Sequence, residues 1–442
     1  MREKKRKERR KMREKKERRD NKMELPKYLY PKYYSVVLTY GNQKEEKDIK
    51  LYKNLKLEKD FLQVKVYYQQ NHENNYNYEK KLKEETNISN KKLQNILNSR
   101  DALFNFIQYF KEVKFASKKY NTGIGFTNAW KKMYEVCQKS NFIPSKVNTI
   151  KHLDICGLPG GFVLAINHYL KTKTNVKEYD WYLQSYLEKG YLQDDFGMVK
   201  KYPKRFLEGD ITSRKKIEHY IKFFDKNKRN IVTSDCGLGG AEAYNSPDFD
   251  FRDKQMMKIF LGQFVCGLGV LEKGGNFFMK SYNSFNKFTV SLIYLMSSFF
   301  QKVTLLKPML SKQPEGKEIY YCLYNFTGIT DDQLNKLLNI LQNYTSDDLD
   351  RNIVSYTKMN KKLISQIEER LAKYYYQKLE ISYKVEEYRQ NLIGFDISDD
   401  PEEYLNTIQE IKKSVLPNYK RFISHYYKNL KYERIKDNDK LL

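Results

Sequence analysis

The chain has 442 residues, of which 40% are hydrophobic, and this is enough for two or three folded domains. It has no run of 18 or more apolar residues, and its charged N-terminus lacks the apolar stretch of a signal peptide. The five cysteines form no Cys-x-x-Cys pair and the five histidines are scattered. We therefore expect a cytoplasmic protein with no membrane association, with reduced thiols in a reducing compartment, and with neither a disulfide nor a metal site.

The formal net charge of +27 is partly concentrated at the N-terminus. Residues 1–22 hold fourteen Lys or Arg and five acidic residues, a net +9, and we expect a disordered basic arm there. The other 420 residues carry +18, which favours a polyanionic partner, above all nucleic acid. A generic solubilising surface is the alternative for the body of the chain, and a targeting segment is the alternative for the arm.

Predicted elements begin after the arm, in an N-terminal mixed and helical region over residues 23–119. A Tyr-rich stretch with two prolines predicts extended or irregular structure, and the apolar spacing of residues 87–113 predicts a helix. A second helix is predicted in "FTNAWKKMYEVC", with Thr127 or Asn128 near its start.

From about residue 150, short apolar runs alternate with helical patterns. The runs are "KHLDIC", "DWYLQSYL", "KRFLEGD", "RNIVTSDCG", "GGNFFMKSY", "KVTLLKP" and "KEIYYCLYNF". This alternation predicts an α/β fold with a mostly parallel sheet covered on both faces. The last two runs lack a helical pattern between them, which predicts an antiparallel hairpin at the edge of the sheet. Residues 329–442 show only helical, basic patterns, so we expect a C-terminal helical domain without strands.

A loop with three glycines and a proline follows the first of these strands, in "LDICGLPGGF" at residues 153–162. Glycine lets the backbone turn sharply and lets a ligand approach closely. The first strand-to-helix loop of a doubly wound sheet also borders the crevice where ligands bind. The loop is therefore well placed for a nucleoside-like cofactor, with an ordinary tight turn as the alternative. Its spacing fits neither the dinucleotide-binding motif nor the P-loop.

"DICGLPGGF" resembles the "D-L-x-x-x-P-G-G-F/W" of FtsJ-like ribose 2′-O-methyltransferases, which have a Rossmann-like fold and bind S-adenosylmethionine at that loop. Further stretches resemble the family's other motifs in the family's order: "TNAWKKMYEV", "EGDIT", "VTSDCG", "GGNFFMKSY" and "KPMLSKQPEGKEIYYC". The resemblance covers residues 120–328, which we predict to be the methyltransferase domain. It is strongest to the versions in large DNA viruses that replicate in the cytoplasm, which would place the protein in the host cytoplasm or the virion.

The resemblance implies roles for individual residues. It implies a catalytic tetrad of Lys132, Asp235, Lys280 and Glu318. It implies no metal site, and it places Asp210 at the adenine of the cofactor. The cofactor contacts that it implies come from Gly157, Pro159, Gly160, Gly161, Phe162, Asp210 and Asp235. We expect Asp154, at the end of the strand before the loop, to brace the loop and not to bind the cofactor.

The chemistry needs a base within hydrogen-bond reach of the ribose hydroxyl when the methyl group is attacked. The resemblance makes Lys280 this base, which requires a neutral lysine, and the ordinary pKa of lysine is ~10.4. Partial burial and the cation of Lys132 would lower the pKa of Lys280, whereas Asp235 and Glu318 would raise it. We therefore expect the two carboxylates to act mainly by position. Taken one at a time, these residues could also be solvated charges at strand ends or residues that form turns. The order in which all their motifs occur along the chain favours a catalytic role.

Two departures from the family pattern bear on the substrate. "SKQ" keeps only the Ser and a basic residue of the family's "S-R" pair, and the second strand lacks the acidic end of the bacterial ribosomal-RNA enzymes. Cap-methylating relatives often lack that acidic residue too. We therefore expect methylation of the first transcribed nucleotide of capped mRNA, with other capping or transcription proteins as candidate partners. The alternatives are a ribosomal-RNA methyltransferase and a catalytically inactive RNA-binding subunit on the same fold.

Overall fold

The computed structural model describes residues 25–41, 48–86, 88–104, 109, 127–145, 147–187, 194–237, 248–282, 284–311 and 317–429. The predicted arm of residues 1–22 lies outside these residues, as do residues 120–126 of the predicted methyltransferase domain and residues 312 and 313 of "SKQ". Within the described ranges, no helix is both long enough and apolar enough to cross a membrane.

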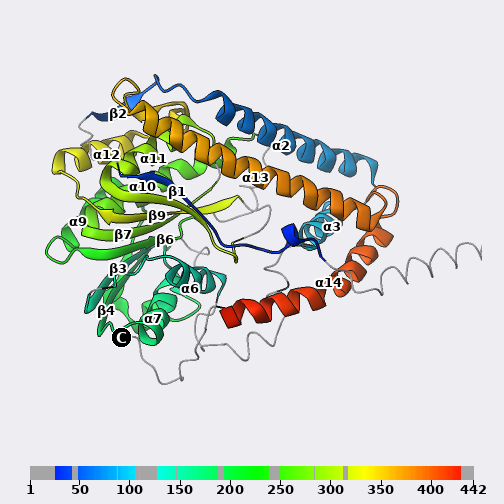
Figure 1. The fold of residues 1–442 in the computed structure, drawn as a ribbon, viewed down its shortest axis with the longest axis horizontal. Helices are drawn as coiled ribbons and strands as arrows, with labels where there is room; N and C mark the ends of the chain where they lie inside the picture. The colour runs from blue at the N-terminus through cyan, green and yellow to red at the C-terminus, as the bar shows by residue number, and fades with distance from the viewer. Residues whose placement is uncertain are drawn as a thin grey trace, which may run out of the picture.

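A large mixed sheet forms the centre of the molecule (Figure 1). Its strands are β1 (Tyr34–Tyr40), β3 (Thr149–Ile155), β4 (Glu178–Ser185), β5 (Phe206–Glu208), β6 (Arg229–Ser234), β7 (Leu271–Tyr282), β8 (Phe300–Lys307) and β9 (Glu318–Phe326). Their spatial order is β1-β8-β9-β7-β6-β3-β4-β5, and the five strands from β7 to β5 pair in parallel. This confirms the predicted Rossmann-like, mostly parallel sheet.

The antiparallel pairs lie together at one edge of the sheet, as predicted, but the outermost strand comes from the N-terminal region. β1 pairs with β8 on the far side of the β8–β9 hairpin. The β1–β8 register shifts between Val37 and Thr39. Arg370 donates hydrogen bonds to the carbonyls of Val37 and Leu38, both at 2.8 Å. A C-terminal side chain thus satisfies backbone groups that the irregular register frees.

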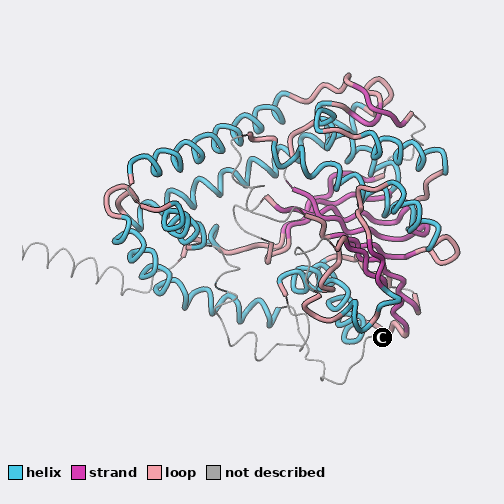
Figure 2. Tube along the Cα trace, turned by 180° about the vertical axis from the view of Figure 1, so that it is seen from behind, coloured by secondary structure: helices cyan, strands magenta, loops and turns pink. Residues whose placement is uncertain are grey.

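Helices cover both faces of the sheet (Figures 1 and 2). One core contains α3 (Asn90–Ala102), α6 (Asn128–Lys139), α7 (Gly161–Lys173) and α14 (Pro401–Asn429). The other contains α2 (Lys59–Glu85), α9 (Arg214–Phe223), α10 (Phe251–Val270), α11 (Lys287–Phe299), α12 (Asp331–Asn343) and the first half of α13 (Lys361–Ile393). Alternate strand residues supply the two cores, since Phe278 faces α6 and α7 whereas Phe277 and Met279 face α10.

The N-terminal and C-terminal regions pack against each other. α2 and α13 lie side by side in both views, and Tyr68 donates a hydrogen bond to the carbonyl of Tyr375 at 3.0 Å. β2 (Ile49–Tyr52) pairs antiparallel with β10 (Asn352–Val354). The expectation of no strand beyond residue 329 was therefore wrong, because β10 is only three residues long and depends on a distant partner.

Short helices complete the described elements: η1 (Lys27–Leu29), α8 (Met198–Lys201), η2 (Pro203–Arg205) and η4 (Ser346–Asp350). The first half of the helix predicted in residues 87–113 corresponds to α3, whose N-cap Ser89 accepts a hydrogen bond from the backbone N–H of Lys92, while residues 105–108 and 110–113 lie outside the described residues. Thr127 caps α6 in the same way, by accepting from the N–H of Trp130 at 3.2 Å. The boundaries of the four predicted domains stay predictions.

Candidate active site

The four predicted catalytic residues meet at one edge of the sheet. Asp235 directly follows β6, Lys280 is near the end of β7, and Glu318 is the first residue of β9. Because β9 runs antiparallel to β7, its start lies at the end of β7, where Lys280 pairs with Tyr320 and Tyr282 pairs with Glu318. Paired residues of a ladder share one face of the sheet. Lys132 reaches the same face from α6.

The four side chains form one ion-pair network. Lys280 Nζ lies 3.2 Å from Asp235 Oδ1 and 3.5 Å from Glu318 Oε2. Lys132 Nζ lies 3.0 Å from Glu318 Oε1. Glu318 therefore contacts both lysines, one with each carboxylate oxygen. The side chains are only 9% to 21% exposed, so their charges interact more strongly than they would at an open surface.

Tyr320 closes this network and was not predicted. Its hydroxyl accepts a hydrogen bond from Lys132 Nζ at 2.8 Å and donates one to Asp235 Oδ1 at 3.0 Å. Its ring stacks on Phe278, with 4.6 Å between the ring centres, which fixes the hydroxyl. The available signal was its position two residues after Glu318 in a strand, since residues i and i+2 share a face.

The charges of the network set the protonation of its members. Burial by itself would raise the pKa of Glu318, but Lys132, Lys280 and Lys307 outweigh burial and lower it to about 2. Burial by itself would lower the pKa of Lys280, but Asp235 and Glu318 outweigh it and raise this pKa above the ordinary value.

The lowered pKa that we expected for Lys280 is therefore wrong. Two carboxylates contact Lys280 directly, whereas the described contacts of the Lys132 ammonium group go to Glu318 and Tyr320. The raised pKa favours the protonated form of Lys280, which has to lose its proton before it can act as a base.

Lys307 supports the backbone of Glu318. It is the last residue of β8 and is 3% exposed. Its Nζ donates a hydrogen bond to the backbone carbonyl of Glu318 at 2.6 Å. Burial lowers the pKa of Lys307 to about 7, with a further contribution from Lys132, while Glu318 opposes the shift. The Lys-Pro pair at the end of this strand was the sequence signal for it.

The glycine-rich loop joins β3 to α7 and depends on glycine at two positions. Gly160 has φ +105°, in the left-handed region, and precedes the first residue of α7. A Cβ on Gly161 would lie 3.0 Å from Thr127 Oγ1, so α7 and the start of α6 could not approach as closely with a larger residue. Pro159 follows a cis peptide bond. The side chain of Phe162 is buried against Phe278, so only its backbone can face a cofactor.

Asp154 lies beneath the loop, as expected for a bracing residue. It is fully buried, and its Oδ1 accepts a hydrogen bond from Thr233 Oγ1 at 2.6 Å. A Cβ on Gly157 would lie 2.5 Å from Asp154 Oδ2, so the loop backbone rests directly on the carboxyl group. Burial raises the pKa of Asp154 well above its ordinary value, which favours the neutral acid.

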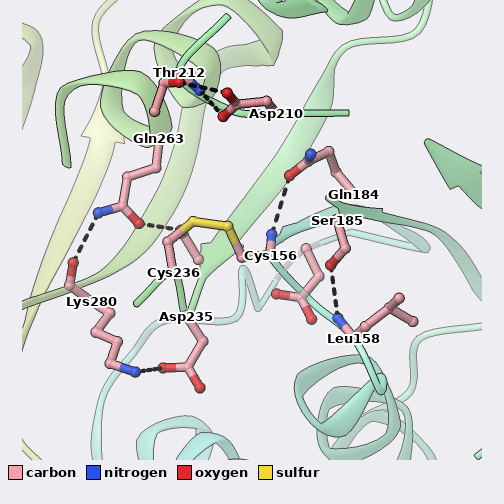
Figure 3. The surroundings of a disulfide bond; sticks show 12 residues. Cys156, Leu158, Gln184, Ser185, Asp210, Thr212, Asp235, Cys236, Gln263 and Lys280 are labelled. Atoms are coloured by element: carbon pink, nitrogen blue, oxygen red, sulfur yellow. Dashed lines mark hydrogen bonds and ion pairs between the residues drawn. A yellow bond between two sulfur atoms is a disulfide. The ribbon is translucent and has the colours of Figure 1, made fainter. Parts of the chain in front are cut away.

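The end of β4 supplies two polar residues that sequence reasoning missed (Figure 3). Ser185 Oγ accepts a hydrogen bond from the N–H of Leu158 at 3.1 Å, and Gln184 Oε1 accepts one from the N–H of Cys156 at 3.2 Å. The amide nitrogen of Gln184 donates to the carbonyl of Gly209. Gln184 therefore ties the loop after β3 to the loop after β5. The strand has no acidic end, but its amide and hydroxyl groups hold the walls of the predicted cofactor crevice.

Asp210 follows β5 in the second of these loops. Its Oδ1 accepts from the N–H of Thr212 at 2.8 Å and its Oδ2 accepts from Thr212 Oγ1 at 2.7 Å (Figure 3). A carboxylate has about four acceptor positions, so it can still accept a hydrogen bond from an amino group. The glycine backbone on one side and this carboxylate on the other fit a nucleoside-containing cofactor. In the described part of the chain, no group of three or more His, Cys, Asp or Glu is placed to hold a metal ion.

Gln263 of α10 connects the ends of β6 and β7 (Figure 3). Its amide oxygen accepts a hydrogen bond from Ser234 Oγ, and its amide nitrogen donates to the carbonyl of Lys280 at 3.0 Å. The side chain is fully buried. It therefore fixes the separation between the residue before Asp235 and the backbone that carries Lys280.

A disulfide joins Cys156 of the glycine-rich loop to Cys236, next to Asp235 (Figure 3). The S–S distance is 2.06 Å and the Cα atoms are 5.1 Å apart. The expectation of no disulfide was therefore wrong. The two cysteines are 80 residues apart in sequence, but β3 and β6 are paired neighbours, so the ends of these strands are adjacent. Cys137, Cys266 and Cys322 are free, as expected, and all three are buried.

Comparison with known proteins gives a family match and several relatives. Residues 126–326 match the family described as FtsJ-like methyltransferase. The chain is 32% identical over 248 residues to a protein of African swine fever virus named "probable methyltransferase". It is 30% identical over 253 residues to an uncharacterised protein of Acanthamoeba polyphaga mimivirus. Over 216 residues it is 26% identical to cap-specific mRNA (nucleoside-2′-O-)-methyltransferase 2 of Drosophila melanogaster.

These matches cover 52%, 54% and 45% of this chain, in the same order. They cover 54% of the swine fever virus protein, 31% of the mimivirus protein and 30% of the Drosophila enzyme. The chain thus spans about half of the length of these relatives, or less.

The disulfide should stabilise the fold, because it closes an 80-residue loop within the sheet. Reducing it should lower the free energy of unfolding by about 2–4 kcal/mol, measured by urea denaturation with and without a thiol reductant. A Cys156→Ser, Cys236→Ser double variant is the control, because its stability should not respond to the reductant. An equal response in the two proteins would show that this bond does not cause the effect.

Proposed function

We propose that this chain, whose residues 126–326 match the FtsJ-like methyltransferase family as its motifs predicted, methylates a ribose 2′-hydroxyl of RNA with S-adenosylmethionine as donor. The observation that carries the proposal is the network of Lys132, Asp235, Lys280 and Glu318. Its members lie up to 186 residues apart in sequence, yet they form one group beside the glycine-rich loop. A structural ion pair needs only one acidic and one basic residue, so a need for an ion pair does not by itself explain a group of four.

We further propose capped mRNA as the substrate and its first transcribed nucleotide as the target. The resemblance to a Drosophila enzyme that is named for cap-specific mRNA methylation supports the choice of capped mRNA. So does β4, which ends in Gln184 and Ser185 without the acidic residue of the bacterial ribosomal-RNA enzymes. The net charge of +27 fits a long polyanionic substrate.

In this mechanism the bound donor supplies a methyl group on a positively charged sulfur. Lys280, once neutral, accepts the proton of the 2′-hydroxyl as the oxygen attacks, and Asp235 orients its amine through the 3.2 Å contact. Lys132 and Glu318 hold the ribose, and Tyr320 and Lys307 keep those two side chains in position. Since the protein's groups are fixed before the substrate arrives, much of the rate enhancement should come from orientation.

The direct test uses purified protein, labelled S-adenosylmethionine, and capped and uncapped RNA of the same sequence, followed by location of the methyl group. We expect a 2′-O-methyl group on the first nucleotide of the capped RNA. Lys280→Met should abolish transfer, because the base is lost, while cofactor affinity measured by calorimetry stays near normal. Lys273→Met, at the exposed opposite end of β7, is the matched control and should behave as wild type. Near-normal turnover by the Lys280 variant would contradict the mechanism.

The raised pKa of Lys280 predicts the pH dependence of the reaction. A protonated lysine becomes a base only as pH rises towards its pKa, so kcat/KM should increase with pH. Glu318→Gln removes one of the two negative charges that raise this pKa, so the increase should move to lower pH even though the maximal rate falls. The measurement is kcat/KM for capped RNA over about pH 6 to 10. A shift to higher pH would exclude Glu318 as a source of the raised pKa.

A further inference from the structure

A second group of cations lies beside the catalytic network and has no part in the chemistry above. Arg252 is in the first turn of α10, and Lys317 directly precedes Glu318. Two aromatic residues, Phe249 and Tyr282, accompany them. All four residues are partly exposed, although Phe249 packs against the hydrophobic core and the Arg252 side chain is only 11% exposed.

The aromatic rings connect this group to the base. The guanidinium carbon of Arg252 lies 5.1 Å from the ring centre of Tyr282, and Lys280 Nζ lies 5.8 Å from the same ring. Lys317 Nζ lies 5.8 Å from the ring centre of Phe249. Contacts with ring faces hold a cation in place without neutralising its charge. Arg252 therefore shares the Tyr282 ring with Lys280, and Lys317 directly precedes Glu318.

Arg252 and Lys317 differ in their acidic neighbours. Arg252 contacts Asp253, with 3.5 Å between Nη2 and Oδ1, and the other oxygen of Asp253 accepts from Ser284 at 2.6 Å and Asn286 at 3.2 Å. Among the described residues, no carboxylate lies within ion-pair distance of Lys317. The other acidic side chains nearby have lysine partners of their own, in the pairs Lys65–Asp250 and Lys254–Asp248.

The pKa of Lys317 reflects its burial and the nearby guanidinium group. Burial, with a further contribution from Arg252, lowers the pKa of Lys317 to about 8, although Asp253 opposes the shift. Two cations that are partly removed from water repel each other, and an anion placed between them removes that cost. A phosphodiester provides such an anion, and the planar guanidinium group of arginine matches its oxygens with two parallel hydrogen bonds.

Residue 237 is a glycine, so no side chain stands there next to Lys280. A Cβ on Gly237 would lie 3.1 Å from the hydroxyl of Tyr282 and 3.4 Å from Lys280 Nζ. Gly237 is itself exposed, so a substrate can come close to its backbone.

We propose that Arg252 and Lys317 form a phosphate-binding subsite that holds the backbone of the RNA next to the ribose to be methylated. The proposal rests on the proposed function, because it takes the polyanion to be an RNA whose ribose is at Lys280. Lys317 and Glu318 are consecutive residues, so one short segment holds both the ribose and an adjoining phosphate. The subsite thereby sets which ribose of the strand reaches the base.

The first test measures RNA binding without catalysis, by fluorescence anisotropy of a short capped RNA. Lys317→Met should weaken binding about tenfold, the usual effect of losing one hydrogen bond between charged groups. It should also reduce the slope of log affinity against log salt by roughly 0.7, the value for one phosphate of a single strand. Lys273→Met removes the same charge at the far end of β7 and should change neither quantity. Cofactor affinity measured by calorimetry verifies that each variant is folded.

The second test identifies the phosphate. A set of RNAs carries an uncharged methylphosphonate at one linkage each, and every RNA is measured with wild type, with Lys317→Met and with Arg252→Lys. At one linkage next to the target nucleotide, the neutral group should weaken binding by wild type about tenfold yet weaken binding by the Lys317 variant far less. Equal losses in both proteins at every linkage would overturn the subsite, as would an Lys317 variant that binds RNA like the Lys273 control.

These outcomes separate the subsite from the proposed function. If wild type binds RNA and shows the linkage-specific effect but transfers no methyl group, the function fails and the subsite stands. If methyl transfer occurs and no linkage is specific to Lys317, the subsite fails and the function stands. A wild-type protein that does not bind RNA overturns both.

Discussion

Glu318 contacts both lysines of the site, one with each carboxylate oxygen, and the rest of the structure keeps this arrangement in place. The reversed direction of β9 puts Glu318 beside the end of β7, where Lys280 lies. Lys307 fixes its backbone, and Tyr320 links Lys132 to Asp235 on the other side. Such a group of buried charges is favourable only when every member has a partner, so the surrounding hydrogen bonds are part of the site.

The loop that we assign to the cofactor is also held by several contacts, and these come from residues at the ends of neighbouring strands. Gln184 and Ser185 bond to its backbone, Asp154 supports it from below, and Cys156 is linked covalently to the residue after Asp235. The donor side and the acceptor side of the proposed reaction therefore meet at the end of β6. A displacement of the loop would be transmitted to Asp235, and through it to Lys280.

Sequence reasoning reached the residues that a motif names and missed those that depend on contacts in space. The order of the motifs was enough to predict the tetrad, and alternating apolar runs predicted the parallel sheet. Cys156 and Cys236 are far apart in sequence and meet only because β3 and β6 are neighbours. α2 escaped notice because only Phe61, Val64 and Leu82 of its 27 residues are buried, so it shows little apolar periodicity. The pKa of Lys280 depended on distances that no spacing along the chain reveals.

The central claim is that Lys280 is the base and that two carboxylates keep it protonated until substrate is in place. The most direct measurement is an NMR titration of the Lys280 side chain, with 13C-labelled lysine, assigned by the Lys280→Met spectrum. The account predicts a pKa above the ordinary ~10.4 of lysine in the free enzyme, and a lower value in Glu318→Gln. A pKa below the ordinary value in the free enzyme, or one that Glu318→Gln leaves unchanged, would contradict it.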